Sequence, residues 1–182
     1  EIYNFLSKVP TRITVVLDQA YYEYLDTRYQ AMDWLNVFDN LIITRTFSKA
    51  YGLAGLRVGY SVSRSDIADY INLVRAPFNV NHNAQIAAIA ALNDVDYLQE
   101  SVRSNAQGIK QLEECFKNLN LNYIKSSANF IAVEFDNALE TYAKLLKEGV
   151  IVRPIEIPNF LRISVGTAEE NIYLIQALKK IL

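Results

Sequence analysis

The sequence predicts an α/β fold with a mostly parallel sheet, followed by a small C-terminal α+β domain. Through residues 1–75, β-branched apolar runs alternate with helical segments, which indicates a sheet covered by helices. From about residue 83 the pattern is helical for a long stretch, and the last third returns to short strands. We therefore expect an α/β domain over residues 1–80, linking helices over 81–119 and the small domain over 120–182.

The first domain is expected to hold three strands, over residues 11–17, 40–46 and 56–61. The first is a β-branched apolar run that ends at Asp18, so we expect it to be buried on both faces. A tyrosine-rich segment from Tyr21 to Tyr29 follows, and packing in a core or an interface is its expected role as a whole.

Helices are expected over residues 63–74, 84–92 and 97–119. The first of them carries one apolar face, made of Ile67, Tyr70, Ile71 and Val74. The linking stretch repeats apolar residues at helical spacing, which indicates a helix with one buried side.

The last third is expected to contain strands near residues 121–124, 130–135, 150–153 and 160–165. A helix over residues 139–147 is expected to end at Gly149. The final helix is expected to begin with a capping box between Thr167 and Glu170.

Composition excludes several kinds of site. The chain has 182 residues, 21% of them charged, and a net charge of −2, so it offers no basic field for nucleic acid. No apolar run is long enough to cross a bilayer. Cys115 has no partner for an intrachain disulfide, and a poly-His metal site cannot be built from His82 alone, so we expect no metal. We expect His82 to begin a helix rather than to act in catalysis.

The segment that carries chemistry is residues 46–60, TFSKAYGLAGLRVGY. Its glycines match neither the P-loop nor the dinucleotide-binding spacing. Thr46 and Ser48 can donate hydrogen bonds to a phosphate, and Arg57 can hold one through its guanidinium. Partial desolvation of Lys49 beside that cation would favour the neutral amine that Schiff-base chemistry requires. On composition alone, a solvated loop with Lys49 in water is an equal alternative.

Asp18 favours the ligand-binding interpretation. Ligands of open α/β sheets bind beyond the carboxyl ends of the strands, so Asp18 and Lys49 can face one crevice. An aspartate there can pair with a protonated pyridine nitrogen, and Tyr21 can donate to a phenolic oxygen. Asp18 can equally cap a helix, and the two roles are compatible.

These residues together resemble the pyridoxal-phosphate site of class I/II aminotransferases, and within that family the histidinol-phosphate aminotransferases. The resemblance rests on Asp18 and Tyr21, followed by the run over residues 46–60. Three further segments are similar in order and spacing, so that the resemblance covers essentially the whole chain: VRAPFNVN (74–81), SANF (127–130) and LRISVGT (161–167).

The resemblance implies a fold-type-I enzyme in which pyridoxal 5′-phosphate is bound covalently by Lys49, which also moves the substrate proton. It implies that Asp18 keeps the pyridine nitrogen protonated and that Tyr21 contacts the ring oxygen. The cofactor phosphate would be held by Thr46, Ser48 and Arg57.

The implied reaction is transamination between histidinol phosphate and 2-oxoglutarate, in histidine biosynthesis. Arg162 matches the arginine that receives the substrate's anionic group, and Arg153 matches a second basic residue nearby. Asn129 lies in a matching segment and is expected to line the pocket. From the residues alone, both arginines stand at strand edges, where a surface ion pair is the more common role.

Members of this family carry further cofactor contacts upstream of the aspartate, and only residues 1–17 precede Asp18 here. Together with the absence of a starting methionine, this leads us to expect the later part of a longer enzyme. Its partners would be a small amino donor and a keto acid, and its state a cytoplasmic homodimer.

Three other functions stay open: an aromatic or broad-specificity aminotransferase, a threonine-phosphate decarboxylase, and a non-catalytic domain that retains the fold.

Overall fold

The structure is a computed structural model that describes residues 1–25 and 31–182. It divides into two compact units, Glu1–Leu98 and Gln99–Leu182. The expected three-part division at residues 80 and 119 remains a prediction. Tyr29, part of the predicted tyrosine cluster, lies outside the described residues.

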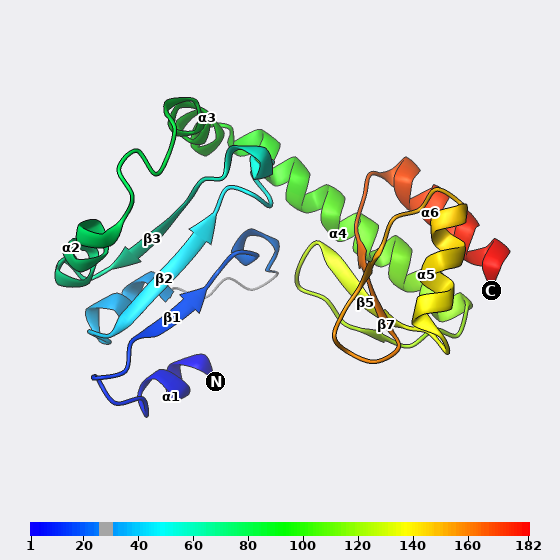
Figure 1. The fold of residues 1–182 in the computed structure, drawn as a ribbon, viewed down its shortest axis with the longest axis horizontal. Coiled ribbons are helices and arrows are strands. Elements are labelled where there is room, and N and C mark those ends of the chain that lie inside the picture. Colours follow the sequence, from blue (N-terminus) through cyan, green and yellow to red (C-terminus); the bar gives the residue numbers. More distant parts are fainter. Residues whose placement is uncertain (26–30) are drawn as a thin grey trace. The chain divides into compact units, whose positions relative to one another are not determined.

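The first unit is built on a three-stranded sheet in which β2 lies between β1 and β3 (Figure 1). The strands are β1 (Val15–Asp18), β2 (Leu41–Thr46) and β3 (Gly59–Ser63). β1 runs parallel to β2, with Asp18 opposite Thr44, whereas β3 runs antiparallel to β2. The α/β class is confirmed, but the sheet within this chain is mixed rather than mostly parallel.

Within residues 1–25 and 31–98, one face of this sheet is covered and the other is open. Leu41 and Ile43 are fully buried under the helix α1 (Ile2–Leu6) and the 3-10 helix η2 (Ala31–Asn36). Val16, on the opposite face, is 58% exposed. The expectation that the first strand is buried on both faces is therefore wrong for this chain, because successive side chains of β1 alternate between a covered and an open face.

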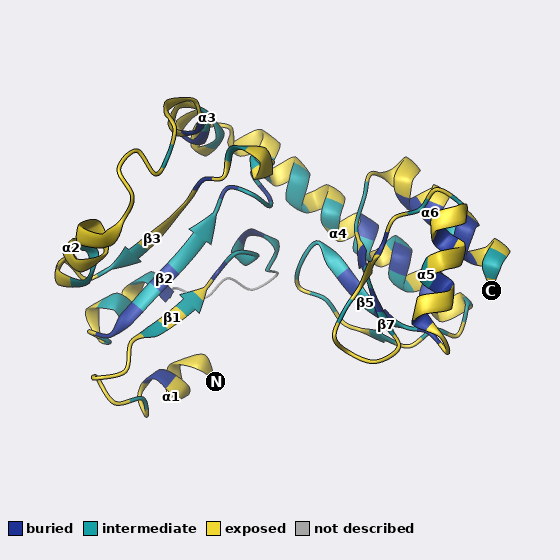
Figure 2. Cartoon of the chain, in the orientation of Figure 1, coloured by how far each residue is buried: buried dark blue, intermediate teal, exposed yellow. Residues whose placement is uncertain are grey.

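Three helices follow the sheet: α2 (Ser65–Val74), α3 (His82–Asn93) and α4 (Val95–Asn118). No residue of α2 is buried, and its predicted apolar face is open in this chain (Figure 2), with Val74 83% exposed. His82 begins α3 as predicted, and the Asn81 side chain caps that helix by accepting from the Ala84 N–H at 2.9 Å.

The second unit contains a four-stranded antiparallel sheet in the order β4-β5-β7-β6. Its strands are β4 (Tyr123–Ile124), β5 (Phe130–Glu134), β6 (Arg153–Pro154) and β7 (Phe160–Ser164). Its further helices are α5 (Ala138–Lys147) and α6 (Ala168–Ile181). β6 is shorter than predicted, because Val150 instead closes the end of α5 by donating to the Leu145 carbonyl at 2.9 Å.

One face of this second sheet forms the core of the unit. Opposed pairs from β5 and β7 are buried against α4, α5 and α6: Ile131 with Ile163 and Val133 with Leu161. The predicted capping box of α6 is present between Thr167 and Glu170. By alternation, Phe130, Ala132 and Arg162 lie on the face away from this core.

Gly108 allows α4 to pack closely against Val165 and Asn171 of the same unit. A Cβ at Gly108 would lie 2.4 Å from Val165 Cγ1 and 2.8 Å from Asn171 Nδ2. We expect Gly108→Ala to lower the free energy of unfolding by about 1–3 kcal/mol in urea titrations, although alanine is the better helix former. Gly55→Ala is the matched control, because nothing lies within 4 Å of the added Cβ. Equal stability of the two variants would contradict the close approach.

Candidate active site

Asp18 lies at the carboxyl end of β1, beside the carboxyl end of β2. Its Oδ1 accepts hydrogen bonds from the Ala20 N–H at 3.0 Å and from the Thr44 hydroxyl at 3.3 Å. The carboxylate thus caps the turn that follows β1, as the structural interpretation predicts, and still stands at the strand edge where ligands bind. Both expected roles are compatible with this geometry.

Lys49 and Tyr21 lie at the same edge of the sheet. Lys49 Nζ is 5.3 Å from the centroid of the Tyr21 ring, within the range of a cation–π contact. Lys49 is half-buried between the buried residues Phe47 and Ala50. It forms no ion pair within residues 1–25 and 31–182, so its amine is not committed to a carboxylate there.

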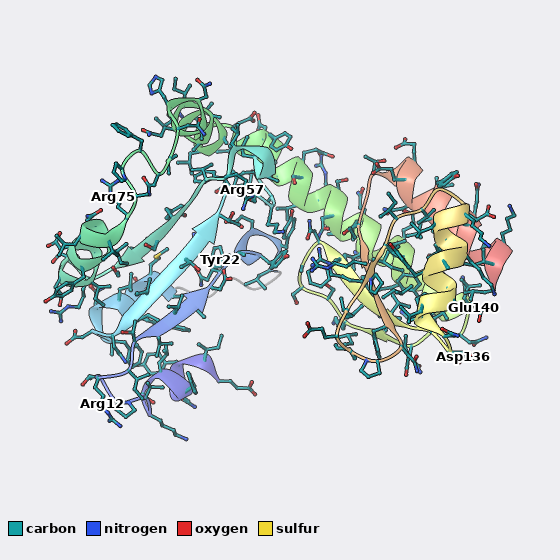
Figure 3. The ribbon with its side chains drawn as sticks, viewed as in Figure 1. Arg12, Tyr22, Arg57, Arg75, Asp136 and Glu140 are labelled. Carbon is teal, nitrogen blue, oxygen red and sulfur yellow. The ribbon has the colours of Figure 1, made fainter. Side chains whose placement is uncertain are left out.

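Hydroxyl and guanidinium groups gather next to Lys49. Thr46 Oγ1 accepts from the Ser48 N–H at 3.0 Å, and Arg57 Nη1 donates to Ser48 Oγ at 3.4 Å and to the Ala54 carbonyl at 2.8 Å. Arg57 and Tyr22 lie near the same end of the sheet (Figure 3). Two hydroxyls and one guanidinium form a donor set that fits a phosphate group.

Arg57 reaches this position through an unusual backbone conformation. Its φ is 55°, in the left-handed region that non-glycine residues seldom adopt. The residue directly follows the 3-10 helix η3 (Ala54–Leu56). This conformation lets the guanidinium return to Ser48 and Ala54, and strain of this kind is found preferentially at functional sites.

Apolar packing against α3 holds the loop that carries Lys49. Phe47 and Val58 form one buried cluster with Ala84 and Ala88 of α3. The Gly52 N–H donates to the Lys49 carbonyl at 2.9 Å and closes a turn for which the glycine φ of 72° is suited. Packing against α3 therefore fixes the position of the loop. Thr46, Ser48 and Lys49 stay half-buried at its surface.

The predicted substrate residues belong to the second unit. Arg153 stands directly opposite Arg162 across β6 and β7, which places two positive charges on one face of the sheet. The Arg162 guanidinium carbon lies 4.6 Å from the Phe130 ring centroid, and its Nε is buried without an acceptor among the described residues. Opposed like charges and an unpaired donor favour an anionic ligand over the surface ion pair of the alternative interpretation.

Asn129 borders that group. Its carbonyl accepts from the Val165 N–H at 2.9 Å, and the preceding carbonyl of Ala128 accepts from Asn105 Nδ2 at 3.1 Å. The Asn129 loop is therefore held by the residue after β7 on one side and by α4 on the other.

Sequence reasoning missed Thr44 and Asn105, which support Asp18 and the Asn129 loop. The strand register that sets Thr44 opposite Asp18 is a tertiary property, although the parallel pairing of the two predicted strands could have suggested it. Asn105 gave no signal, because a polar residue on a long helix is ordinary.

Cys115 and His82 take no part in these groups. Burial raises the pKa of the Cys115 thiol despite the opposing effect of Lys179, and the side chain is 6% exposed, so the thiol is not activated. His82 is exposed at the start of α3.

Comparisons with known proteins show the family of the chain. The family model described as aminotransferase class I and II matches residues 2–178. The chain is 50% identical to histidinol-phosphate aminotransferase 1 of Idiomarina loihiensis and 52% identical to histidinol-phosphate aminotransferase 2 of Pseudomonas aeruginosa, covering 98% of this chain and 50% of each relative.

A solved structure of similar fold is histidinol-phosphate aminotransferase from Sinorhizobium meliloti in complex with pyridoxal-5′-phosphate. The TM-score is 0.89 at 31% identity, over 98% of this chain and 51% of that one. The chain thus spans about half the length of the curated relatives it matches.

Proposed function

Because the chain belongs to the class I and II aminotransferase family, we propose that it carries the lysine-bearing part of an enzyme that transfers an amino group between histidinol phosphate and 2-oxoglutarate. The observation that carries the proposal is the position of Lys49 Nζ, 5.3 Å from the Tyr21 ring and at the strand edge where Asp18 ends β1. The sequence identity of 50% and 52% to two histidinol-phosphate aminotransferases supports the choice of substrate.

Pyridoxal 5′-phosphate, when bound, supplies an electron sink for the charge that develops at the substrate α-carbon. Lys49 would hold the cofactor through its amine, and the same amine would then carry the proton of the substrate α-carbon. The Asp18 carboxylate stabilises a proton on the pyridine nitrogen by charge. Tyr21 would donate to the ring oxygen, and Thr46, Ser48 and Arg57 would hold the phosphate.

Arg162 and Arg153 receive the anionic end of the substrate. The two half-reactions present a carboxylate from glutamate and a phosphate from histidinol phosphate. A guanidinium binds either anion through two parallel hydrogen bonds, and paired guanidiniums suit a site that must accept both. Asn129, in the loop bonded to the residue that follows β7, is assigned to the same anion-binding group.

Covalent trapping tests the enzyme assignment. The full-length gene product is incubated with pyridoxal phosphate, reduced with borohydride, digested and mapped by mass spectrometry. We expect the reduced adduct on Lys49. An adduct-free Lys49 would favour a non-catalytic protein that retains the fold.

Substrate kinetics test the specificity. We expect kcat/KM for histidinol phosphate to exceed that for phenylalanine, and no release of carbon dioxide from threonine phosphate. Equal or better rates with phenylalanine would assign an aromatic or broad-specificity aminotransferase instead, and decarboxylation would assign the decarboxylase.

The proposal includes a cytoplasmic homodimer. The open apolar face of α2 supports an association of some kind, with Tyr70 71% exposed and Val74 83% exposed. Sedimentation of the full-length gene product at several concentrations tests the stoichiometry.

A further inference from the structure

Gln19 and Arg45 form a partly buried polar contact on the face of the sheet opposite to Asp18. Gln19 follows Asp18 in the chain, and only 4% of it is exposed. Arg45 stands between Thr44 and Thr46 on β2. By alternation its side chain shares the covered face of the sheet with Leu41 and Ile43, opposite to Asp18 and Thr44.

The contact joins the ends of both strands. Arg45 Nε donates to Gln19 Oε1 at 3.1 Å, and the Gln19 N–H donates to the Thr44 carbonyl at 2.9 Å. Gln19 thus extends the pairing of β1 with β2 by one residue through its backbone and adds a side-chain bond across the same two strands.

The same pair also holds the turn that carries Tyr21. The Gln19 carbonyl accepts from the Tyr22 N–H at 3.1 Å, and the Arg45 guanidinium carbon lies 3.9 Å from the centroid of the Tyr22 ring. Tyr22 lies beside the end of β2 (Figure 3). The turn from Gln19 to Tyr22 is therefore fixed to β2 at both its start and its end.

We propose that Gln19 and Arg45 are positioning residues, which set the separation of Asp18 and Tyr21 on one strand end from Lys49 on the other. This inference rests on the proposed function. A side chain locked on the covered face at position 19 forces its neighbour at position 18 onto the open face, because side chains of an extended chain alternate. Arg45 is four residues before Lys49, so the lysine loop leaves β2 from the same anchor.

Only one of the two polar groups of the Gln19 side chain has a partner among the described residues. Its Nε2 is buried and has no acceptor within the described parts of the chain. The amide oxygen alone therefore serves Arg45. A carboxylate at this position would keep the acceptor and remove the unpaired donor, so Gln19→Glu is a conservative variant that should preserve positioning.

Cofactor binding to the full-length gene product tests the inference, with pyridoxal phosphate itself as the probe. We expect Gln19→Leu to raise the dissociation constant about tenfold, corresponding to about 1.4 kcal/mol. Leucine fills the space but leaves Arg45 Nε without its acceptor. We also expect the pH midpoint of the visible absorption band of the bound cofactor to move by about 0.5 unit, since the surroundings of Lys49 change. Gln19→Glu should restore both values.

Asn40→Leu is the matched control for a purely structural effect. Asn40 is 9% exposed and bridges the opposite ends of the same two strands, where its Nδ2 donates to the Ile13 carbonyl at 2.6 Å. We expect this variant to lower Tm while the dissociation constant and the pH midpoint stay at wild-type values. Arg45→Lys, which keeps the charge but loses the planar fork, provides a milder second test with the same direction of change as Gln19→Leu.

The outcomes separate the two proposals. Wild-type protein that does not bind pyridoxal phosphate would overturn the proposed function itself. Wild-type protein that binds it, with Gln19→Leu and Arg45→Lys behaving like Asn40→Leu, would overturn the positioning role alone. Failure of Gln19→Glu to restore the pH midpoint would also contradict it, since that variant keeps the acceptor.

Discussion

Lys49→Ala is expected to lower kcat by about 10⁴-fold or more, because in the proposed mechanism one amine both binds the cofactor and moves the substrate proton. No second lysine lies in the loop over residues 46–60 to replace it. The variant should fold, since Lys49 is only half-buried and forms no ion pair within the described residues. Steady-state kinetics at saturating substrate on the full-length gene product measure the loss.

Lys8→Ala is the control, because it removes an exposed lysine from the same unit. It should retain the wild-type rate and the wild-type Tm. Residual activity of Lys49→Ala within a factor of about ten of wild type would contradict both roles assigned to the amine, because general acid–base catalysis by itself is worth more than that.

Asp18→Asn is expected to lower kcat by about 10²–10³-fold, the usual cost of removing one preorganised electrostatic partner. Asparagine has the shape of aspartate, and its amide oxygen can still accept from the Ala20 N–H and the Thr44 hydroxyl, which now lie at 3.0 and 3.3 Å. The substitution therefore removes the charge and leaves the turn intact. Urea unfolding of the variant should match wild type within about 0.5 kcal/mol.

Asp69→Asn, at an exposed position of α2, controls for a general change in net charge. A turnover number for Asp18→Asn equal to that of Asp69→Asn would assign Asp18 to turn capping alone. A large loss of stability without a change in kcat would lead to the same conclusion.

Much of the fold was predictable because apolar periodicity and capping signals are local. The capping box at Thr167 and the end of the helix before Gly149 follow from short sequence patterns, and the structure has both. The strand over residues 11–17 was predicted too long and too buried, because a β-branched run does not reveal which side a neighbour covers. The short β6 has a different cause, because the Val150 N–H bonds to the end of α5 instead of joining the sheet.

The candidate site was predictable where residues adjacent in sequence act together. Thr46, Ser48 and Lys49 needed no tertiary information, and Asp18 needed only the rule that ligands bind at strand ends. The contact between Gln19 and Arg45 could not be predicted. The two residues are 26 positions apart in the sequence, and their contact depends on the register between β1 and β2. The facing of Arg153 and Arg162 likewise depends on the register of β6 with β7.

The left-handed backbone of Arg57, at φ 55°, has a consequence for how this position tolerates change. Glycine would relieve about 1–2 kcal/mol of steric cost, and asparagine would tolerate the conformation, but neither carries a guanidinium. Under the phosphate-binding role proposed for Arg57, selection for folding and selection for cofactor binding therefore act in opposite directions at this one residue. A library of variants screened for thermal stability alone would be enriched in glycine or asparagine here and would lose cofactor affinity as it became more stable.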